Sequence, residues 1–568
     1  MKQLYTFFAF RVAALLALVT VAAVADERPC QEPNLQKPAV FEHKFLDVNL
    51  INCTIASDGE YADSRRTSAA GLEWPKGTGK TAVFTAGIWL VGIHAPTDSL
   101  RTANIDYSTE YQPGPLLETF NTTTKNDSLP VSRADEPRYR LYKVEANRPA
   151  GDSGRQVDPW YEWPGDLGAP YKDLNGNGSW DPGVDVPVFY GDQQIWSVVN
   201  DVNNTKHTSL GHTPPMGVEM QVLYYAFDQP GVLQNTMFMR WTIINKSDAD
   251  YDSVYVSLWS DVDLGDNNDD LPACDTTLDM GYVFNGDNDD GTSRGYGSTP
   301  PAVGFAYLQG PIVPGLPTDS ARVGDGWRKG FENLGLTSFV PWCCGQFASL
   351  IDPPDASPNY APIAYAYTKG MMGTARVYLT RPDGSIITYY FSGDPVAGTG
   401  DLHENFPLGV WPPSDNKTLA NSGPFTLAKG DSQEVVAALV ISQGTDRLNS
   451  VTLLKQDVVT ISSLHESGIV VNVADNDMPL PEGFSLSQNY PNPFNPSTTI
   501  EFALPHAGFA TLKVYNVLGE EVAKLIAGDH DAGTFKATWD ASGMPSGMYF
   551  YRLTAGNFVA TKKLMLLK

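Results

Sequence analysis

A run of prolines and asparagines near the C-terminus constrains this chain more than any other feature. Residues 489–496, Asn-Tyr-Pro-Asn-Pro-Phe-Asn-Pro, place three prolines and three asparagines in eight positions. Each proline fixes φ and removes a backbone donor, so the run fits neither a helix nor a central strand. We predict a stiff loop that leads into the last part of the chain.

Short strand patterns separated by turn residues surround this loop. Phe535, Ala537 and Trp539 alternate along one of them, which places three apolar side chains on one face of the strand. The predicted strands are residues 498–502, 510–515, 521–526, 533–539, 548–554 and 558–567, and residues 484–488 form a seventh if they pair ahead of the loop. So many short strands in so short a segment predict an Ig-like β-sandwich.

The same segment resembles a known family. The ordered motifs are LSQNYPNPFNP (486–496), VYNVLG (514–519), WD (539–540), SGMYFY (546–551) and KKLMLLK (562–568). They are similar to those of the type A C-terminal sorting domain of the type IX secretion system, an export route of Bacteroidota and related bacteria. The resemblance covers residues 483–568. The alternative is an ordinary Ig-like spacer module.

The resemblance implies several partners. It implies handling by the type IX translocon, passage across the outer membrane and removal of the domain by a dedicated peptidase. In many members of the family the body is then attached to a surface lipopolysaccharide. We therefore expect a protein that is secreted or held at the outer cell surface.

The N-terminus carries a second export signal. Lys2 and Arg11 precede or flank an apolar run at residues 12–24, and Ala23-Val24-Ala25 offers a small-residue cleavage site. We predict a secretory signal peptide at residues 1–25. The apolar run is shorter than the roughly 20 residues that a membrane-spanning helix needs, so no transmembrane segment is predicted.

The body between these signals is strongly acidic. The formal net charge of the chain is −26; residues 1–25 contribute +2 and residues 483–568 contribute +1, which leaves −29 for residues 26–482. Such a surface repels nucleic acid and attracts cations. At 568 residues the chain is longer than one core usually supports, so we expect several domains.

We predict a mainly β protein whose body is a β-sandwich of one or two domains. Its parts are a β-rich segment at 26–215, an antiparallel β segment at 216–473 that ends in a helix, and a linker at 474–482. Residues 218–227, 236–245 and 253–259 alternate with Asn, Gly and Asp turns, which predicts an antiparallel meander. The helix is predicted after Asp446, where apolar residues begin to recur at steps of three and four.

The first candidate cation site is a loop at residues 173–185. Oxygen-bearing side chains occupy its positions 1, 3, 5 and 9, and Gly178 stands at position 6, which resembles an EF-hand-type calcium loop. Position 12 is Val184 instead of glutamate, and Pro182 prevents a regular following helix. The spacing is then closer to the calcium loops of extracellular β-proteins, and a plain surface turn is the alternative. The predicted calcium ligands are Asp173, Asn175, Asn177, Ser179, Asp181 and Asp185.

The second candidate cation site is a dense group of aspartates. Residues 261–290 contain ten aspartates, and no lysine or arginine occurs in that stretch. Their mutual repulsion would be severe if they converged without a cation. We predict Asp261, Asp263 and Asp266 as metal ligands because the first two directly end a predicted strand. The alternative is that these loops extend into water.

No catalytic motif is recognisable. None of the eight histidines stands in H-E-x-x-H, and no G-x-S-x-G elbow occurs. We expect a non-enzymatic, calcium-stabilised structural or adhesive protein. The alternative is a secreted polysaccharide hydrolase that uses an Asp/Glu pair near the aromatic loops, which contain Trp160, Tyr161 and Trp163.

Overall fold

The computed structural model describes most of the body and of the C-terminal domain. The described residues are 42–65, 68–124, 136, 138–146, 162–182, 184–291, 294–324, 326–343, 347–468, 484–489, 492–504, 508–530, 533–556 and 558–567. The predicted signal peptide, the predicted linker, Trp160 and Tyr161 lie outside them. No helix among the described residues is long and apolar enough to cross a membrane.

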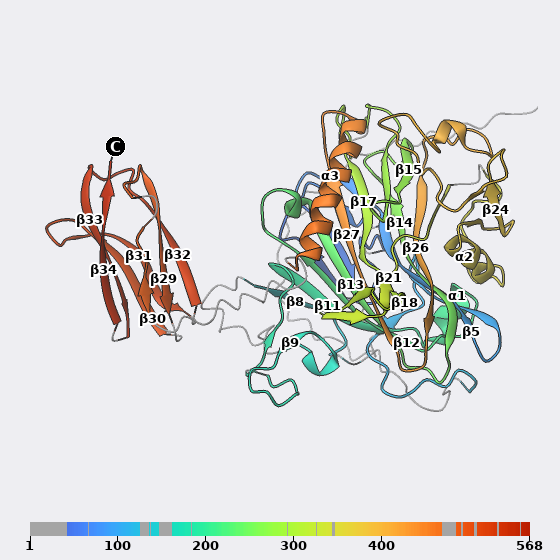
Figure 1. Ribbon diagram of the computed structural model, residues 1–568, viewed down its shortest axis with the longest axis horizontal. Coiled ribbons are helices and arrows are strands. Elements are labelled where there is room, and N and C mark those ends of the chain that lie inside the picture. The colour runs from blue at the N-terminus through green and yellow to red at the C-terminus, as the bar shows by residue number, and fades with distance from the viewer. Residues whose placement is uncertain are drawn as a thin grey trace, which may run out of the picture. The chain divides into compact units, whose positions relative to one another are not determined.

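Two large antiparallel sheets form the body (Figure 1). The larger sheet has the order β15 (Asp270–Asp275), β16 (Met280–Asn285), β17 (Ala302–Gln309), β27 (Ser432–Ser442), β13 (Thr236–Asn245), β12 (Val218–Ala226), β11 (Gln193–Asn200) and β7 (Gln112–Pro113), and β8 (Tyr142–Glu145) also pairs with β11. The smaller sheet has the order β22 (Ser338–Cys343), β26 (Asn416–Leu427), β14 (Tyr251–Val262), β5 (Thr85–His94) and β6 (Ser99–Asn104). The predicted mainly β fold is confirmed.

One hydrophobic core joins the two sheets. The hydroxyl of Tyr307, on β17, lies 2.9 Å from the carbonyl oxygen of Ala420 on β26 and 3.1 Å from that of Val256 on β14. Gly281, on β16, allows close packing there, because a Cβ atom at this position would lie 2.5 Å from the ring of Phe339 on β22. Residues on both sides of position 215 therefore contribute to both sheets and to the same core.

The predicted meander is wrong in its third strand. β12 and β13 pair as expected, and the side chains of β13 alternate, with Met239, Trp241 and Ile243 buried and Arg240 and Thr242 half-buried. β14, however, crosses to the smaller sheet, where it pairs with β5 and β26, while β27 takes its place beside β13. The side-chain amide of Asn245, at the end of β13, stabilises this crossing. It donates to the backbone carbonyl of Ala249, in the connection to β14, and to that of Leu427, at the end of β26.

The predicted helix is present as α3 (Arg447–Glu466). The Asp446 carboxylate accepts hydrogen bonds from the backbone N–H groups of Leu448 and Asn449, as an N-cap does. The helix lies along the larger sheet beside β17 and β27 (Figure 1). Its buried apolar residues are Val451, Leu454, Val458 and Ile461.

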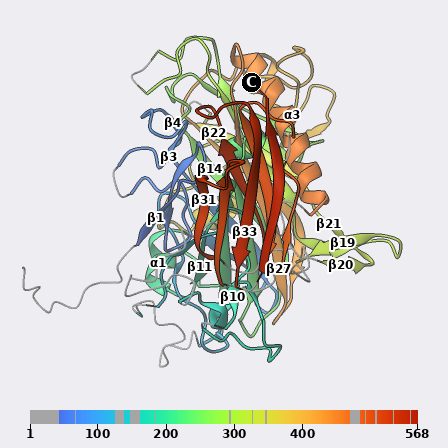
Figure 2. The same ribbon diagram turned by 90° about the vertical axis from the view of Figure 1, so that its left-hand side faces the viewer.

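Smaller elements complete the body. A four-stranded sheet has the order β1 (His43–Leu46), β2 (Asn52–Ala56), β3 (Leu72–Glu73) and β4 (Thr81–Val83). Two short helices are α1 (Asn204–Ser209) and α2 (Tyr360–Thr368). The remaining short strands are β9 (Tyr171–Lys172) with β10 (Val186–Pro187), β18 (Ile312–Pro314) with β21 (Phe331–Asn333), β19 (Ser320–Val323) with β20 (Gly326–Lys329), and β23 (Met371–Met372), β24 (Val377–Thr380) and β25 (Ile386–Ile387). The β19–β20 hairpin projects from the body (Figure 2).

The C-terminal domain is a two-sheet sandwich with its own core. One sheet has the order β28 (Ser485–Leu486), β29 (Ser497–Leu504) and β32 (Gly533–Asp540), and the other has β31 (Glu521–His530), β30 (Gly508–Tyr515), β33 (Gly547–Ala555) and β34 (Phe558–Leu566). The predicted seven short strands are thus confirmed.

The loop rich in proline and asparagine is anchored to this core. The ring of Phe494 is buried and lies 5.6 Å from that of Trp539. The Tyr551 hydroxyl donates to the carbonyl of Ser487 (2.6 Å) and accepts from the N–H of Asn489 (2.9 Å).

Candidate metal centre

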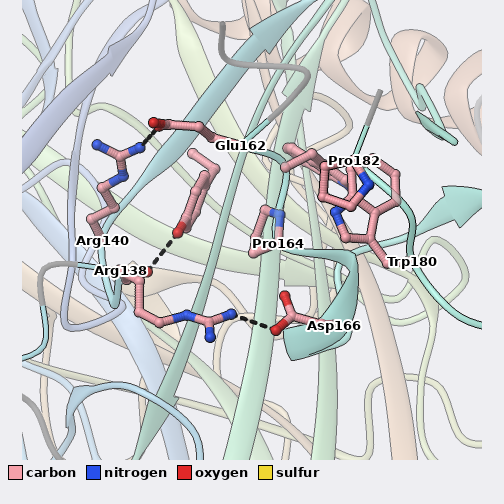
Figure 3. A pocket seen from close by; sticks show the side chains of 9 residues that line it. Arg138, Arg140, Glu162, Pro164, Asp166, Trp180 and Pro182 are labelled. Carbon is pink, nitrogen blue, oxygen red and sulfur yellow. Dashed lines mark hydrogen bonds and ion pairs between the residues drawn. The ribbon is translucent and has the colours of Figure 1, made fainter. Parts of the chain in front are cut away.

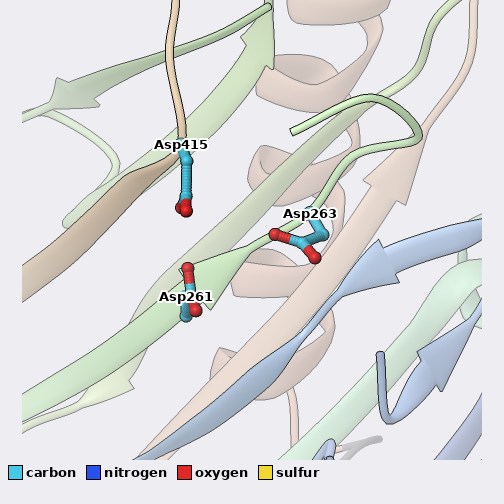
Figure 4. A group of neighbouring side chains, drawn as sticks. All are labelled: Asp261, Asp263 and Asp415. Atoms are coloured by element: carbon cyan, nitrogen blue, oxygen red, sulfur yellow. The ribbon is translucent and has the colours of Figure 1, made fainter. Parts of the chain in front are cut away.

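Three aspartates converge where two strands of the smaller sheet begin and end (Figure 4). Asp261 is the penultimate residue of β14, Asp263 follows that strand, and Asp415 precedes β26. β14 and β26 are antiparallel, and Asp261 pairs with Lys417 in their register. This register therefore brings Asp415 to the position beside Asp263. One carboxylate oxygen from each of the three aspartates lies within 4.8 Å of the others.

The partners of Asp261 leave one of its oxygens open. The Tyr107 hydroxyl donates to Oδ2 at 2.8 Å. Oδ1 is buried and receives no hydrogen bond from the described residues, although the Lys417 ammonium lies 3.5 Å away. The same ammonium lies closer to Asp415 Oδ1, at 2.7 Å. The only described donor near this buried oxygen is an ammonium at 3.5 Å that bonds more closely to Asp415, so this atom is poorly satisfied and is the clearest ligand position of the cluster.

The cluster holds excess negative charge. Burial raises the pKa of Asp261 to about 8; Lys417 lowers it, while Asp415 and Asp263 raise it further. Burial and the charge of Asp415 raise the pKa of Asp263 to about 6. Both shifts disfavour the ionised carboxylates, and a bound cation would reverse them. Carboxylate oxygens are ligands that Ca²⁺ prefers.

Asp266, the third predicted ligand, lies outside this cluster. Its backbone N–H donates to Asp290 Oδ1 at 2.9 Å, and its carboxylate accepts the N–H of Asn268 at 3.1 Å. The prediction did not include Asp415. No local pattern could have identified it, because only the pairing of β14 with β26 brings it to the site.

The other aspartates between residues 261 and 290 have different roles. Asp290 accepts the N–H groups of Asp266 and Tyr296, and Asp279 accepts that of Leu336. Asp275 forms an ion pair with Lys455 at 3.0 Å. Asp287 and Asp289 are exposed. Asp270 is fully buried and accepts the N–H of Leu264, and Asp269 accepts the side-chain amide of Asn285. The acidic segment therefore combines hydrogen-bonded structural residues, the converging pair Asp261 and Asp263, and solvated residues.

The loop at residues 173–185 is closed at its base by the pairing of β9 with β10. The Asp173 carboxylate accepts the N–H groups of Gly176 and Gly178 at 2.7 Å each, and these bonds lower its pKa. Gly178 has φ +76, the left-handed conformation that glycine adopts readily. The loop thus folds around the Asp173 side chain.

The remaining predicted ligands of this loop also face one another. The side-chain amides of Asn175 and Asn177 donate to Asp181 Oδ2 at 2.7 and 2.5 Å. Asp185 is buried and accepts the N–H groups of Leu174 and Asp181, and the Ser179 N–H donates to Asn177 Oδ1 at 2.8 Å. Both oxygens of Asp173 and of Asp185, and Oδ1 of Asn177, already accept backbone N–H groups, so a cation in this loop would have to replace or share these contacts.

The histidine that lies between two carboxylates is buried and unsuited to catalysis. His207 Nδ1 lies 2.8 Å from Glu110 Oε1, and Nε2 lies 3.3 Å from Asp201 Oδ2. All three side chains are fully buried, so no substrate reaches them. His403 is also buried; it stacks on Phe391 at 4.3 Å, and burial lowers its pKa to about 4.

The C-terminal sandwich defines an exported protein. Residues 488–567 match the family model of the secretion system C-terminal sorting domain. The chain therefore carries a type IX secretion sorting domain, which sends the protein to the cell surface or releases it, as the sequence motifs predicted. The match covers the end of the chain and does not extend into the body.

Two other comparisons concern the whole chain. No curated protein matches it. A match among solved structures is the crystal structure of dimeric latent PorU from Porphyromonas gingivalis, with 11% sequence identity and a TM-score of 0.13. It covers 66% of this chain and 31% of the PorU chain.

Proposed function

We propose that the exported body is a non-enzymatic, calcium-stabilised β module with a structural or adhesive role at the cell surface. The open, buried Oδ1 of Asp261 among three carboxylates is the observation that carries this proposal. One ammonium, that of Lys417, offsets only part of the charge of Asp261, Asp263 and Asp415.

Calcium fits this centre better than a softer metal. All of the candidate ligand atoms are oxygens, and no histidine or cysteine among the described residues belongs to the cluster. Ca²⁺ takes six to eight oxygens in flexible geometry, so three carboxylates supply part of a shell that backbone oxygens and water complete. The loop at residues 173–185 is a second proposed calcium site, with the six ligands predicted from its spacing.

Thermal unfolding of the purified protein tests the proposal. Saturation of one site at a hundred times its Kd stabilises the folded state by about 2.7 kcal/mol, so calcium should raise Tm and a chelator should lower it. Asp261→Asn should remove much of that shift. Asp252→Asn is the matched control, because Asp252 lies exposed on the same strand. A Tm that is the same in calcium and in chelator would overturn the proposal.

The residues around the described aromatic side chains give little support to the alternative, a polysaccharide hydrolase. Trp163 is buried. The nearby carboxylates of Glu162 and Asp166 form ion pairs with Arg140 and Arg138. Each carboxylate already accepts a hydrogen bond from a guanidinium, whereas a catalytic carboxyl must lie within hydrogen-bond reach of its substrate. Assays for new reducing ends on soluble polysaccharides should therefore be negative.

We also propose the later steps of export. A peptidase of the type IX system would remove the Ig-like sorting domain, and a surface lipopolysaccharide would then hold the body. The mass of the exported protein tests the first step, since cleavage shortens the chain from its C-terminal end. A shift of the exported form to lipopolysaccharide-like mobility tests the second.

A further inference from the structure

An open pocket of about 570 Å³ lies beside β8 and the loop at residues 173–185. Two of its lining residues, Trp180 and Pro182, belong to that loop (Figure 3). None of the proposed calcium ligands lines this pocket. The other lining residues are Arg138, Arg140, Tyr142, Glu162, Trp163, Pro164 and Asp166.

The polar side of the pocket consists of two ion pairs. Arg138 Nη2 lies 2.5 Å from Asp166 Oδ2, and Arg140 pairs with Glu162. These side chains are between one third and one half exposed, so their outer edges reach solvent. Each pair presents N–H donors and carboxylate acceptors side by side, and the two pairs together carry no net charge.

The apolar side of the pocket consists of an indole and two prolines. In Figure 3 the arginines lie on one side of Pro164, and Trp180 and Pro182 lie on the other. Trp180 is half-buried and makes an edge contact with Tyr171 at 5.3 Å. It lies so close to Gly165 that a Cβ atom there would be 2.7 Å from the indole ring. The glycine therefore allows Trp180 to occupy this position.

We propose that this pocket binds an uncharged carbohydrate. A sugar ring has an apolar C–H face that an indole can cover and a rim of hydroxyls that donate and accept at once. The pocket offers both surfaces, and arginine–carboxylate pairs suit neighbouring hydroxyls because their donors and acceptors alternate. The neutral charge of the pocket and the acidic body both disfavour an anionic ligand. The inference does not depend on calcium at either proposed site.

Binding to a printed array of neutral and uronic-acid-containing oligosaccharides tests the proposal, with the purified full chain as the probe. Calorimetry then measures Kd for the strongest neutral oligosaccharide. Trp180→Ala should raise that Kd by at least about fivefold, which corresponds to a loss of about 1 kcal/mol for a truncated aromatic contact. Trp327→Ala is the matched control, since Trp327 is 67% exposed on the β19–β20 hairpin.

A second variant separates binding from folding. Arg138→Gln removes one ion pair from an exposed position and should also weaken binding while Tm changes little; Arg328→Gln, on the hairpin, is its control. No binding to any neutral oligosaccharide would overturn the proposal. Binding to uronic-acid glycans alone would overturn it as well, and so would equal affinities of Trp180→Ala and Trp327→Ala.

Discussion

Asp261 and Asp415 lie far apart in the sequence, yet a carboxylate oxygen of each lies within 4.8 Å of the other. The pairing of β14 with β26 produces this proximity. The pairing of the two strands fixes the backbone on both sides, so the repulsion between the carboxylates is relieved by a bound proton or a bound cation and not by separation of the strands. This rigidity is the reason that a cation should stabilise the fold.

Removal of the C-terminal domain should prevent export. A chain that lacks residues 483–568 should accumulate in the periplasm, because those residues carry the sorting domain. Immunoblots of periplasmic, surface and medium fractions check this, with the full-length Trp327→Ala variant as the control that should be exported normally. Appearance of the truncated chain outside the cell would contradict the assignment of the domain.

Loss of the cap of α3 should destabilise the body modestly. Asp446→Ala removes a carboxylate that accepts two backbone N–H groups, and such a loss costs about 1 kcal/mol. Denaturant unfolding of the purified protein measures the change. Gln456→Ala, on the exposed side of the same helix, should change stability by less than about 0.5 kcal/mol. Equal effects of the two variants would argue against the cap.

The ion pair of His207 should make stability depend on pH. Burial alone would lower the pKa of His207, but Glu110 and Asp201 raise it to about 10 from its ordinary value of 6.5. The folded protein therefore binds more protons than the unfolded chain between these two values. The resulting stabilisation is fully present below pH 6.5 and is lost as the pH rises through about 10.

Denaturant unfolding of wild type and of His207→Gln across pH 6 to 10 isolates this contribution. The difference in unfolding free energy between them should shrink by a few kcal/mol as the pH rises. His212→Asn is the control, because His212 is exposed, and its curve should follow that of wild type. A His207→Gln curve parallel to wild type would show that His207 is not charged in the folded protein.

Local patterns in the sequence predicted local structure well. The alternation along β13 and the cap at Asp446 each follow from neighbouring residues, and both are present. The proline-rich loop and the strands of the C-terminal domain could be predicted equally well, because turn residues separate them at short intervals. The export signal could be read from the same residues.

Features that depend on distant pairing could not be predicted. The sequence pattern of β14 predicts a strand. The sheet to which it belongs depends on its pairing with β5 and β26, which lie far from it in the chain. Asp415 joins Asp261 and Asp263 through that same pairing. Asp266 follows them closely in the sequence but turns toward Asp290, because the chain bends after Leu264.

Calorimetric titration of calcium into the purified protein measures directly whether the three aspartates bind the ion. Wild type, Asp415→Asn, Asp173→Asn and the control Asp252→Asn would be compared. We expect that Asp415→Asn loses one class of calcium site while retaining the loop site, that Asp173→Asn loses the loop site, and that Asp252→Asn binds as wild type does. Identical titrations for Asp415→Asn and wild type would contradict a calcium site at the three aspartates.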